Sequence, residues 1–168
     1  MSSQDQMTAE HASFAAYKVL IVDDNAALRG ALRVTLQALG CAQVIETDNA
    51  ERALTLLKKQ HVDLMITDWK MKPLDGIELV RQLRNPMASP APYLPVIMLT
   101  AYSQTEKLRQ ARNAGVNDVL VKPFTAEGLA RCLRSVLTSN RPFIETETFF
   151  GPDRRATPRP DTPAMMAG

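Results

Sequence analysis

The segment Val19-Leu20-Ile21-Val22-Asp23-Asp24 decides the fold of this chain. Its four apolar residues do not alternate with polar ones, which is typical of a strand that is buried on both faces in a parallel sheet. Two carboxylates follow at once and mark the end of the strand. The segment therefore predicts an interior strand whose carboxyl end carries Asp23 and Asp24.

Four more apolar runs follow, at residues 44–45, 64–66, 96–99 and 119–121, and stretches with helical periodicity alternate with them. Gly40 and Gly115 stand where two of these helices are expected to end. The helical stretches are marked by Leu28, Leu32, Leu36 and Leu39, by Ala50, Ala53, Leu54 and Leu57, by Ile77, Val80 and Leu83, by residues 105–114, and by Leu129, Cys132, Leu133, Val136 and Leu137. Five strands alternating with five helices predict an α/β fold with a doubly wound parallel sheet.

Composition narrows the class of protein. The 168 residues are 45% apolar and 23% charged, which suits one globular domain with tails. A net charge of +2 is too small to indicate a nucleic-acid or membrane surface, and no apolar run is long enough to span a bilayer. Cys41 and Cys132 are expected to be buried free thiols, and no Cys/His spacing predicts zinc. The first residues show no secretory pattern, so we expect a cytoplasmic protein.

Chemically active side chains stand where the predicted strands end. Asp23 and Asp24 follow the first strand, Asp68 the third, Thr100 the fourth and Lys122 the fifth. In doubly wound sheets, ligands bind outside the carboxyl ends of the strands, so we expect these five residues to converge there. Taken singly, these residues could have ordinary structural roles. Asp23 and Asp24 could cap a helix, Asp68 could begin a turn, and Lys122 could be a surface lysine.

Charge arithmetic indicates what such a cluster does. Three carboxylates at close quarters repel one another unless a cation balances them, and Mg²⁺ is the divalent ion that suits oxygen ligands beside a phosphoryl group. A carboxylate can attack phosphorus, so Asp68 is predicted to form an aspartyl-phosphate. Haloacid-dehalogenase-type phosphotransferases use similar groups, but they need a second aspartate two residues after the nucleophile, where this chain has Lys70.

These residues resemble the CheY-like response regulator receiver family over residues 18–139. The matching motifs are Val19 to Asp24, Asp68-Trp69-Lys70-Met71 with Gly76, Pro95 to Ala101, Ala114-Gly115, and Val121-Lys122-Pro123-Phe124. The resemblance implies a flavodoxin-like (βα)5 sheet of strand order 2-1-3-4-5, and a cis peptide before Pro123. It also implies phosphorylation of Asp68 by a sensor histidine kinase or a histidine phosphotransfer protein. Mg²⁺ would be held by Asp24, Asp68 and the Lys70 backbone carbonyl, with Asp23 close by as a metal-site residue that acts partly through water. Thr100 and Lys122 would contact the phosphoryl group.

The chain departs from the family pattern near the site. Lys72 fills the place, four residues after the phosphoacceptor, where many members have proline, and Pro73 comes one later. Val119 replaces the aromatic residue that usually reports activation. Two alternatives follow: Val119 itself could pack in two states, or Tyr102 could perform part of that role. Residues expected to modulate the site are Trp69, Lys70, Ala101, Tyr102, Val119 and Pro123.

We divide the chain into a flexible segment at 1–16, a receiver domain at 17–139 and a tail at 140–168 that is disordered after Arg155. The tail is too short for a DNA-binding or catalytic output domain. Its prolines exclude long helices, but its aromatic and basic residues suggest docking. These are Arg141, Phe143, Phe149, Phe150, Arg154 and Arg155. We consider three alternatives for this tail. It could fold back onto the domain, become ordered on a partner protein, or hold an anionic ligand such as a cyclic dinucleotide.

The expected function is a binding module rather than an enzyme. Phosphorylation would shift an equilibrium between two conformations of an output face that binds an unknown partner protein. The face that the family uses corresponds to the predicted helix at 105–114, the fifth strand and the last helix. A degenerate receiver, which acts as a scaffold and ignores phosphate, is the alternative from a second class.

Overall fold

The computed structural model describes residues 14–139 and 141–155 of the chain. Seven strands are present in the described part: β1 (Lys18–Val22), β2 (Gln43–Thr47), β3 (Leu64–Asp68), β4 (Val96–Thr100), β5 (Asp118–Val121), β6 (Phe143–Glu145) and β7 (Phe150–Pro152). The helices are α2 (Ala26–Ala38), α3 (Ala50–Lys59), α4 (Gly76–Leu83), α5 (Thr105–Ala114) and α6 (Ala126–Thr138). None of the described helices is long and apolar enough to cross a membrane.

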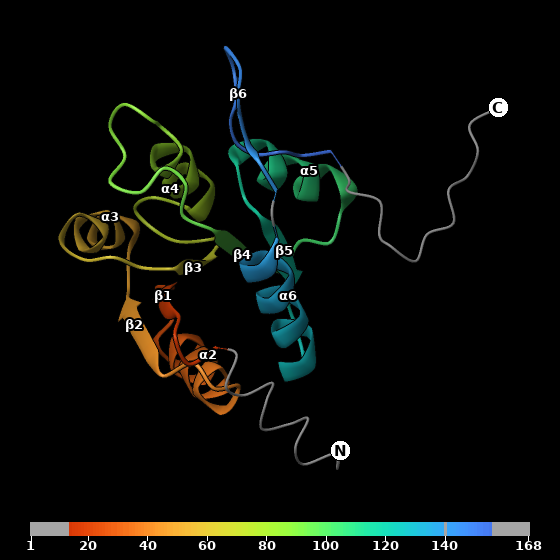
Figure 1. Ribbon diagram of the computed structural model, residues 1–168. Helices are drawn as coiled ribbons and strands as arrows, with labels where there is room; N and C mark the ends of the chain where they lie inside the picture. The colour runs from red at the N-terminus through yellow and green to blue at the C-terminus, as the bar shows by residue number, and fades with distance from the viewer. Residues whose placement is uncertain (1–13, 140, 156–168) are drawn as a thin grey trace.

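The main sheet confirms the predicted fold. Its five strands are parallel and lie in the order β2-β1-β3-β4-β5. β1 lies between β2 and β3, and all four apolar residues from Val19 to Val22 are fully buried, as a strand covered on both faces requires. Figure 1 shows α2 and α6 on one face of the sheet and α3, α4 and α5 on the other.

Polar side chains begin most of the helices. Asn25, Asn49, Asp75 and Thr125 each accept a hydrogen bond from a backbone N–H in the first turn of the helix that follows. At the other end of α5, Gly115 has a φ of 105°, a left-handed conformation that glycine adopts without steric cost. These local signals set where four of the described helices begin and where α5 ends.

Two hydrophobic cores lie on the two faces of the sheet. One contains residues of α3, α4 and α5 together with Trp69, and the other contains residues of α2 and α6. Cys41 and Cys132 are free and buried, as predicted. Successive side chains of a strand point into opposite cores. Both cores therefore pack against β3, which ends at Asp68.

Two sequence expectations need correction. Residues 14–16 belong to the fold and not to the flexible segment that we expected over 1–16. Phe14 is 3% exposed because it packs into the core beside α2 and α6. Leu28 was placed on the apolar face of its helix, but it is 47% exposed at the start of α2. The rest of the N-terminal segment lies outside the described residues.

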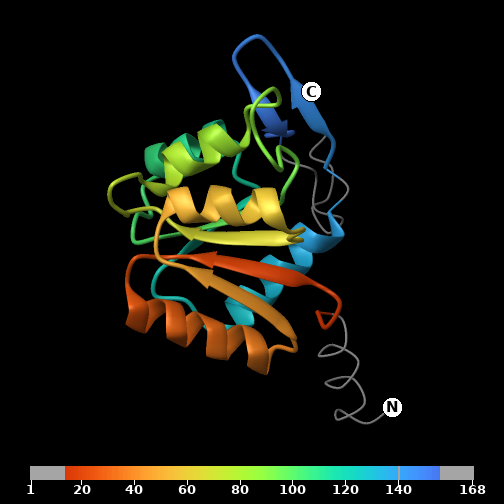
Figure 2. The ribbon, with the colours of Figure 1, turned by 90° about the vertical axis from the view of Figure 1, so that its left-hand side faces the viewer.

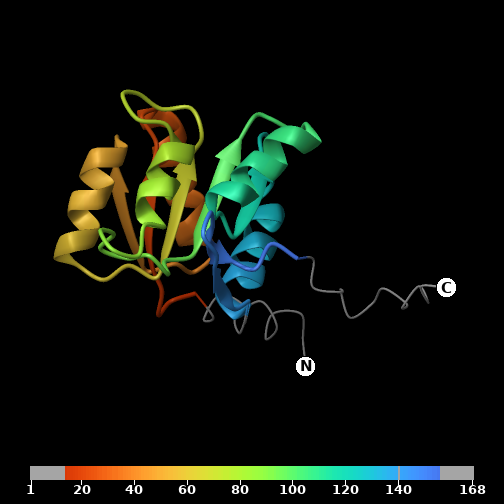
Figure 3. The same ribbon diagram turned by 90° about the horizontal axis from the view of Figure 1, so that it is seen from above.

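After α6 the chain turns back and forms a hairpin. β6 and β7 pair antiparallel, and Phe143 and Phe150 contact Tyr93, which precedes β4, at ring-centroid distances of 5.1 and 5.4 Å. Figures 2 and 3 show the hairpin beside α5, and in Figure 2 it lies toward the amino ends of the parallel strands. The hairpin is therefore remote from the carboxyl ends where the acidic residues lie.

A buried arginine holds the base of the hairpin. Arg84 is 4% exposed, donates hydrogen bonds to the carbonyls of Gly115 and Pro92 and to the side chain of Asn117, and stacks on Phe143. Burial lowers the pKa of its guanidinium to about 9. One side chain thus joins α4, the loops before β4 and β5, and the hairpin.

Candidate functional site

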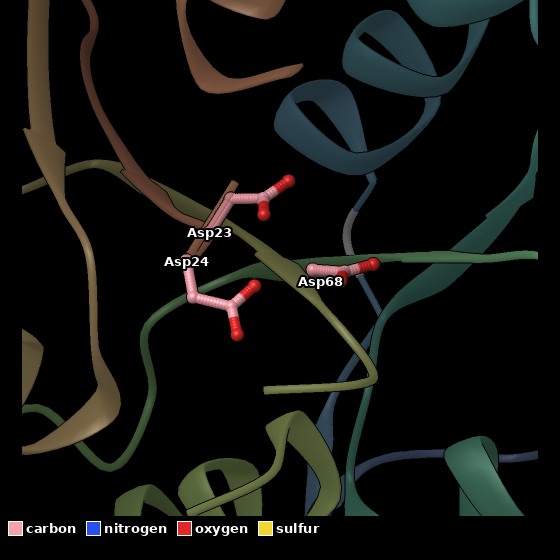
Figure 4. Close-up of side chains that lie close together, drawn as sticks. All are labelled: Asp23, Asp24 and Asp68. Atoms are coloured by element: carbon pink, nitrogen blue, oxygen red, sulfur yellow. The ribbon is translucent and has the colours of Figure 1, made fainter. Parts of the chain in front are cut away.

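Three carboxylates meet at the carboxyl ends of β1 and β3. Asp23 and Asp24 follow β1, and Asp68 is the last residue of β3 (Figure 4). One carboxylate oxygen of each residue lies within 4.8 Å of those of the other two. Asp23 and Asp68 are buried, whereas Asp24 is exposed. The structure thus brings together side chains that stand 44 or 45 positions apart in the sequence.

The turn after β1 is held by its own hydrogen bonds. The N–H of Asp23 donates to the carbonyl of Thr47 at the end of β2, and the N–H of Asn25 donates to the Asp23 carboxylate at 2.9 Å. Burial raises the pKa of Asp23, the bond from Asn25 opposes this effect, and the negative charge of Asp68 reinforces it. The protein therefore keeps Asp23 in an environment that a cation would make more favourable.

Lys122 and Thr100 complete the arrangement from the neighbouring strands. The ammonium of Lys122 lies 2.8 Å from the Asp68 carboxylate, and the Lys122 N–H donates to the carbonyl of Thr100. Thr100 is 1% exposed, and its hydroxyl accepts a hydrogen bond from the Tyr102 N–H. The peptide between Lys122 and Pro123 is cis, as the resemblance implied.

The donor set fits a magnesium ion. The cluster contains three carboxyl groups and one ammonium, that of Lys122, so a divalent cation would balance the remaining carboxylate charge. Carboxylate oxygens are hard ligands, which Mg²⁺ prefers, and this ion commonly takes its remaining ligands from water or phosphate. The proposed contribution of the Lys70 carbonyl stays a prediction.

An aromatic pair borders the site. Trp69 is buried directly after Asp68, and its ring meets that of Tyr102 edge to face at a centroid distance of 5.3 Å. The ammonium of Lys107, on α5, lies 5.7 Å from the Trp69 ring centroid and 5.2 Å from that of Tyr102. The ammonium of Lys70 lies 5.2 Å from the Tyr102 ring centroid. The pair thus connects β3, which ends at Asp68, with α5.

The other predicted modulating residues differ in exposure. Val119 is partly buried and packs against the same core as Trp69 and Tyr102. Ala101 and Pro123 are exposed beside Thr100 and Lys122. Their effects on phosphoryl lifetime stay predictions.

Gly76, at the start of α4, has a steric reason to be glycine. Its N–H donates to the carbonyl of Trp69, and a Cβ at this position would collide with the main-chain carbonyl of Asp68. The loop that leads to it contains a second cis peptide, between Lys72 and Pro73. Gly76 therefore lets α4 begin directly against the backbone of Asp68.

The tail residues contact their own domain. Phe149 is buried, Phe143 and Phe150 pack with Tyr93, and Arg141 is exposed. Arg154 stacks on Phe149 with its guanidinium carbon 4.2 Å from the ring centroid, and donates to the side chain of Asn113. Arg155 pairs with Asp153. Among the alternatives for this segment, folding back matches the described contacts.

Sequence reasoning missed Arg29, which donates a hydrogen bond to the main-chain carbonyl of Asp23. The available signal was its place in the helix that follows the acidic turn, which lets a long side chain reach back to that turn. An arginine on an amphipathic helix is usually an exposed surface residue, so this signal is weak without the fold.

Comparison with known proteins identifies the family. Residues 19–134 match the model of the response regulator receiver domain. The chain is 39% identical over 119 residues to the chemotaxis protein CheY-3 of Vibrio cholerae, covering 71% of this chain and 90% of that protein. It is 36% identical over 119 residues to the chemotaxis protein CheY of Pseudomonas aeruginosa, covering 71% and 94%.

Solved structures agree with these matches. CheY4 of Vibrio cholerae superposes with a TM-score of 0.66 at 35% identity, covering 72% of this chain and 98% of that one. The receiver domain of the sensor histidine kinase PA1611 of Pseudomonas aeruginosa, solved with a magnesium ion in its active-site cleft, gives a TM-score of 0.65 at 28% identity, covering 73% and 98%. Fold, site geometry and relatives agree, and the chain belongs to the response regulator receiver family.

Proposed function

We propose that this chain is a phosphorylation-controlled binding module in which Asp68 accepts a phosphoryl group from a phosphohistidine. The donor is a sensor histidine kinase or a histidine phosphotransfer protein. The observation that carries the proposal is the Asp68 carboxylate itself, which lies 2.8 Å from Lys122 and within 4.8 Å of two further carboxylates. Membership in the receiver family also removes the dehalogenase-type alternative.

The proposed transfer divides its chemistry among residues of neighbouring strands. An oxygen of Asp68 attacks the phosphorus, the bond from phosphorus to the donor imidazole nitrogen breaks, and the electron pair returns to that nitrogen. Lys122, already beside Asp68, balances charge on the phosphoryl oxygens, and the hydroxyl of Thr100 can donate a hydrogen bond to one of them.

Mg²⁺ would be held by Asp23, Asp24, Asp68 and, as the resemblance implies, the Lys70 carbonyl. When bound, the ion neutralises the charge of the carboxylates and of the incoming phosphoryl group. Asp23 and Asp24 therefore serve as ligands that the turn after β1 already holds near Asp68.

The output is proposed to be binding of a partner protein by α5, β5 and α6. Phosphorylation would shift a pre-existing equilibrium of this face. Val119 has no aromatic ring, which many family members use at this position to report activation. Tyr102, in contrast, contacts both Trp69 and Lys107 of α5. These contacts support a contribution of Tyr102 to the coupling.

Phosphorylation of the intact protein by a small-molecule phosphodonor in the presence of Mg²⁺ tests the proposal. Intact-mass measurement should show one added phosphoryl group that hydroxylamine removes, because acyl phosphates are attacked by this nucleophile. Beryllofluoride with Mg²⁺ should change the fluorescence of Trp69, since its indole adjoins the phosphoacceptor.

The matched variants are Asp68→Asn and Asp48→Asn. Asp68→Asn should abolish the mass increase, whereas Asp48→Asn, whose carboxylate pairs with Arg52, should be phosphorylated like wild type. Labelling of Asp68→Asn at the wild-type rate would show that another residue is the phosphoacceptor. Partner binding that is equal with and without phosphorylation would instead support the scaffold alternative.

The contacts of the tail do not favour the anionic-ligand alternative. A cyclic dinucleotide would need guanidinium groups that are available to its phosphates. Arg154 is stacked on Phe149 and bonded to Asn113, and Arg155 is paired with Asp153. Such a ligand would therefore have to compete with contacts within the chain.

A further inference from the structure

Arg29 links the acidic turn to the body of the sheet. It lies in the first half of α2, and its side chain is 19% exposed. One terminal nitrogen donates to the main-chain carbonyl of Asp23 at 2.7 Å. That carbonyl belongs to the peptide that joins Asp23 to Asp24, so the bond fixes the orientation of the peptide between the two carboxylate-bearing residues.

The other end of this link is Glu46 of β2. The Nε of Arg29 lies 3.4 Å from one carboxylate oxygen of Glu46, and Arg33 lies 3.1 Å from the other oxygen. Thr47, the next residue of β2, accepts the N–H of Asp23. Both main-chain polar groups of Asp23 are thus tied to the end of β2, the N–H directly and the carbonyl through Arg29.

We propose that Arg29 is a positioning residue for the cation site, which it preorganises by holding the Asp23–Asp24 peptide in one orientation. This inference rests on the proposed function, because it presumes that the three carboxylates take up Mg²⁺. A site whose ligands are already fixed loses less conformational entropy when the ion binds. Residues that orient metal ligands typically change metal affinity by about 10- to 100-fold when they are replaced.

The direction in which Mg²⁺ affinity changes when Arg29 is replaced distinguishes a positioning role from an effect of its charge. Arg29 is a cation near the place where Mg²⁺ would bind, so its charge alone opposes the ion, and removing that charge should tighten binding. Loss of positioning should weaken binding. Arg33 is the matched control, since it lies on the same helix, pairs with the same Glu46 and has a more exposed side chain. Among the hydrogen bonds of the described residues, none joins Arg33 to the main chain of Asp23.

The experiment is a Mg²⁺ titration of the full chain by calorimetry at constant ionic strength, with Trp69 fluorescence as a second readout. Arg29→Met should weaken Mg²⁺ binding by about 10-fold. Arg33→Met should leave the affinity unchanged or slightly tighter. Arg29→Lys keeps the positive charge but cannot contact the Asp23 carbonyl and Glu46 at the same time. It should therefore weaken Mg²⁺ binding less than Arg29→Met does, and a change of charge cannot explain that loss.

Hydrogen exchange of the amides of Asp24 and Asn25, measured without Mg²⁺, should be faster in Arg29→Met than in Arg33→Met. If Arg29→Met does not fold, the Arg29→Lys titration and its amide exchange decide the matter. Affinity of the Arg29 variants equal to or tighter than that of Arg33→Met overturns the inference alone. Absence of Mg²⁺ binding by the wild-type chain overturns the proposed function, and the inference with it.

Discussion

Replacement of Asp23 by asparagine is expected to stabilise the protein when no divalent cation is present. Asp23 is 3% exposed and has the carboxylates of Asp24 and Asp68 within 4.8 Å. At that distance two like charges repel by about 3.5 kcal/mol at an effective dielectric constant of about 20. The attraction of Lys122 offsets roughly one of the two repulsions. Because Asp24 is exposed, water screens the repulsion that remains, which leaves a net gain of about 1–3 kcal/mol for the neutral amide.

The asparagine is a close replacement, because its side-chain oxygen can still accept the hydrogen bond from the N–H of Asn25. For a chain of this length, each kcal/mol corresponds to about 2–4 °C in melting temperature, so an increase of about 2–12 °C is expected. The assay is thermal unfolding followed by circular dichroism, in the presence of a chelator.

Mg²⁺ should then reduce or reverse the difference in melting temperature between Asp23→Asn and wild type. The ion stabilises wild type by about 2.7 kcal/mol at 100 times its dissociation constant, and it should stabilise Asp23→Asn much less because one ligand is lost. Asp48→Asn serves as the control and should not raise the melting temperature, since Asp48 pairs with Arg52. A lower melting temperature for Asp23→Asn in chelator would refute the electrostatic reasoning.

Three further outcomes follow from single contacts. Burial raises the pKa of Asp23, so its carboxyl binds a proton more readily in the folded state; without Mg²⁺, stability should increase as pH falls through the folded-state pKa toward 3.8, and unfolding titrations of Asp23→Asn should lack this component. Gly76→Ala should cost about 3 kcal/mol and slow phosphodonor labelling, because the added methyl group displaces the carbonyl of Asp68; a wild-type urea midpoint would contradict this. Phe143→Ala should cost about 2 kcal/mol in urea unfolding, since it uncovers the buried Arg84 and leaves Tyr93 with one aromatic neighbour fewer, and unchanged stability would mean that the hairpin does not hold the domain.

The interior strands and the residues at their ends were readable without a structure. An uninterrupted apolar run such as residues 19–22 can be buried on both faces in only a few architectures, and parallel strands necessarily end at a common edge. Asp23, Asp68 and Lys122 could therefore be grouped from their positions alone. The order of the strands was not contained in that pattern and came from the resemblance to the receiver family.

What the tertiary structure decided are contacts between residues that local periodicity does not relate. Helical spacing grouped Leu28 with the apolar residues of its helix, but in the folded domain its side chain is exposed. The aromatic residues of the tail indicated docking without naming a surface. Tyr93 and Arg84 provide that surface, and both lie about 50 or more positions away in sequence.

The same division holds within the site. The types of side chain and their places at strand ends specify a cluster that suits a cation and a phosphoryl group, because this chemistry depends on charge and ligand type. The support of that cluster by Arg29 and Glu46 depends on how α2 packs against β2, which is set by the packing of the whole domain. The sequence by itself thus determined which residues could react, and the tertiary structure decided which residues hold them in place.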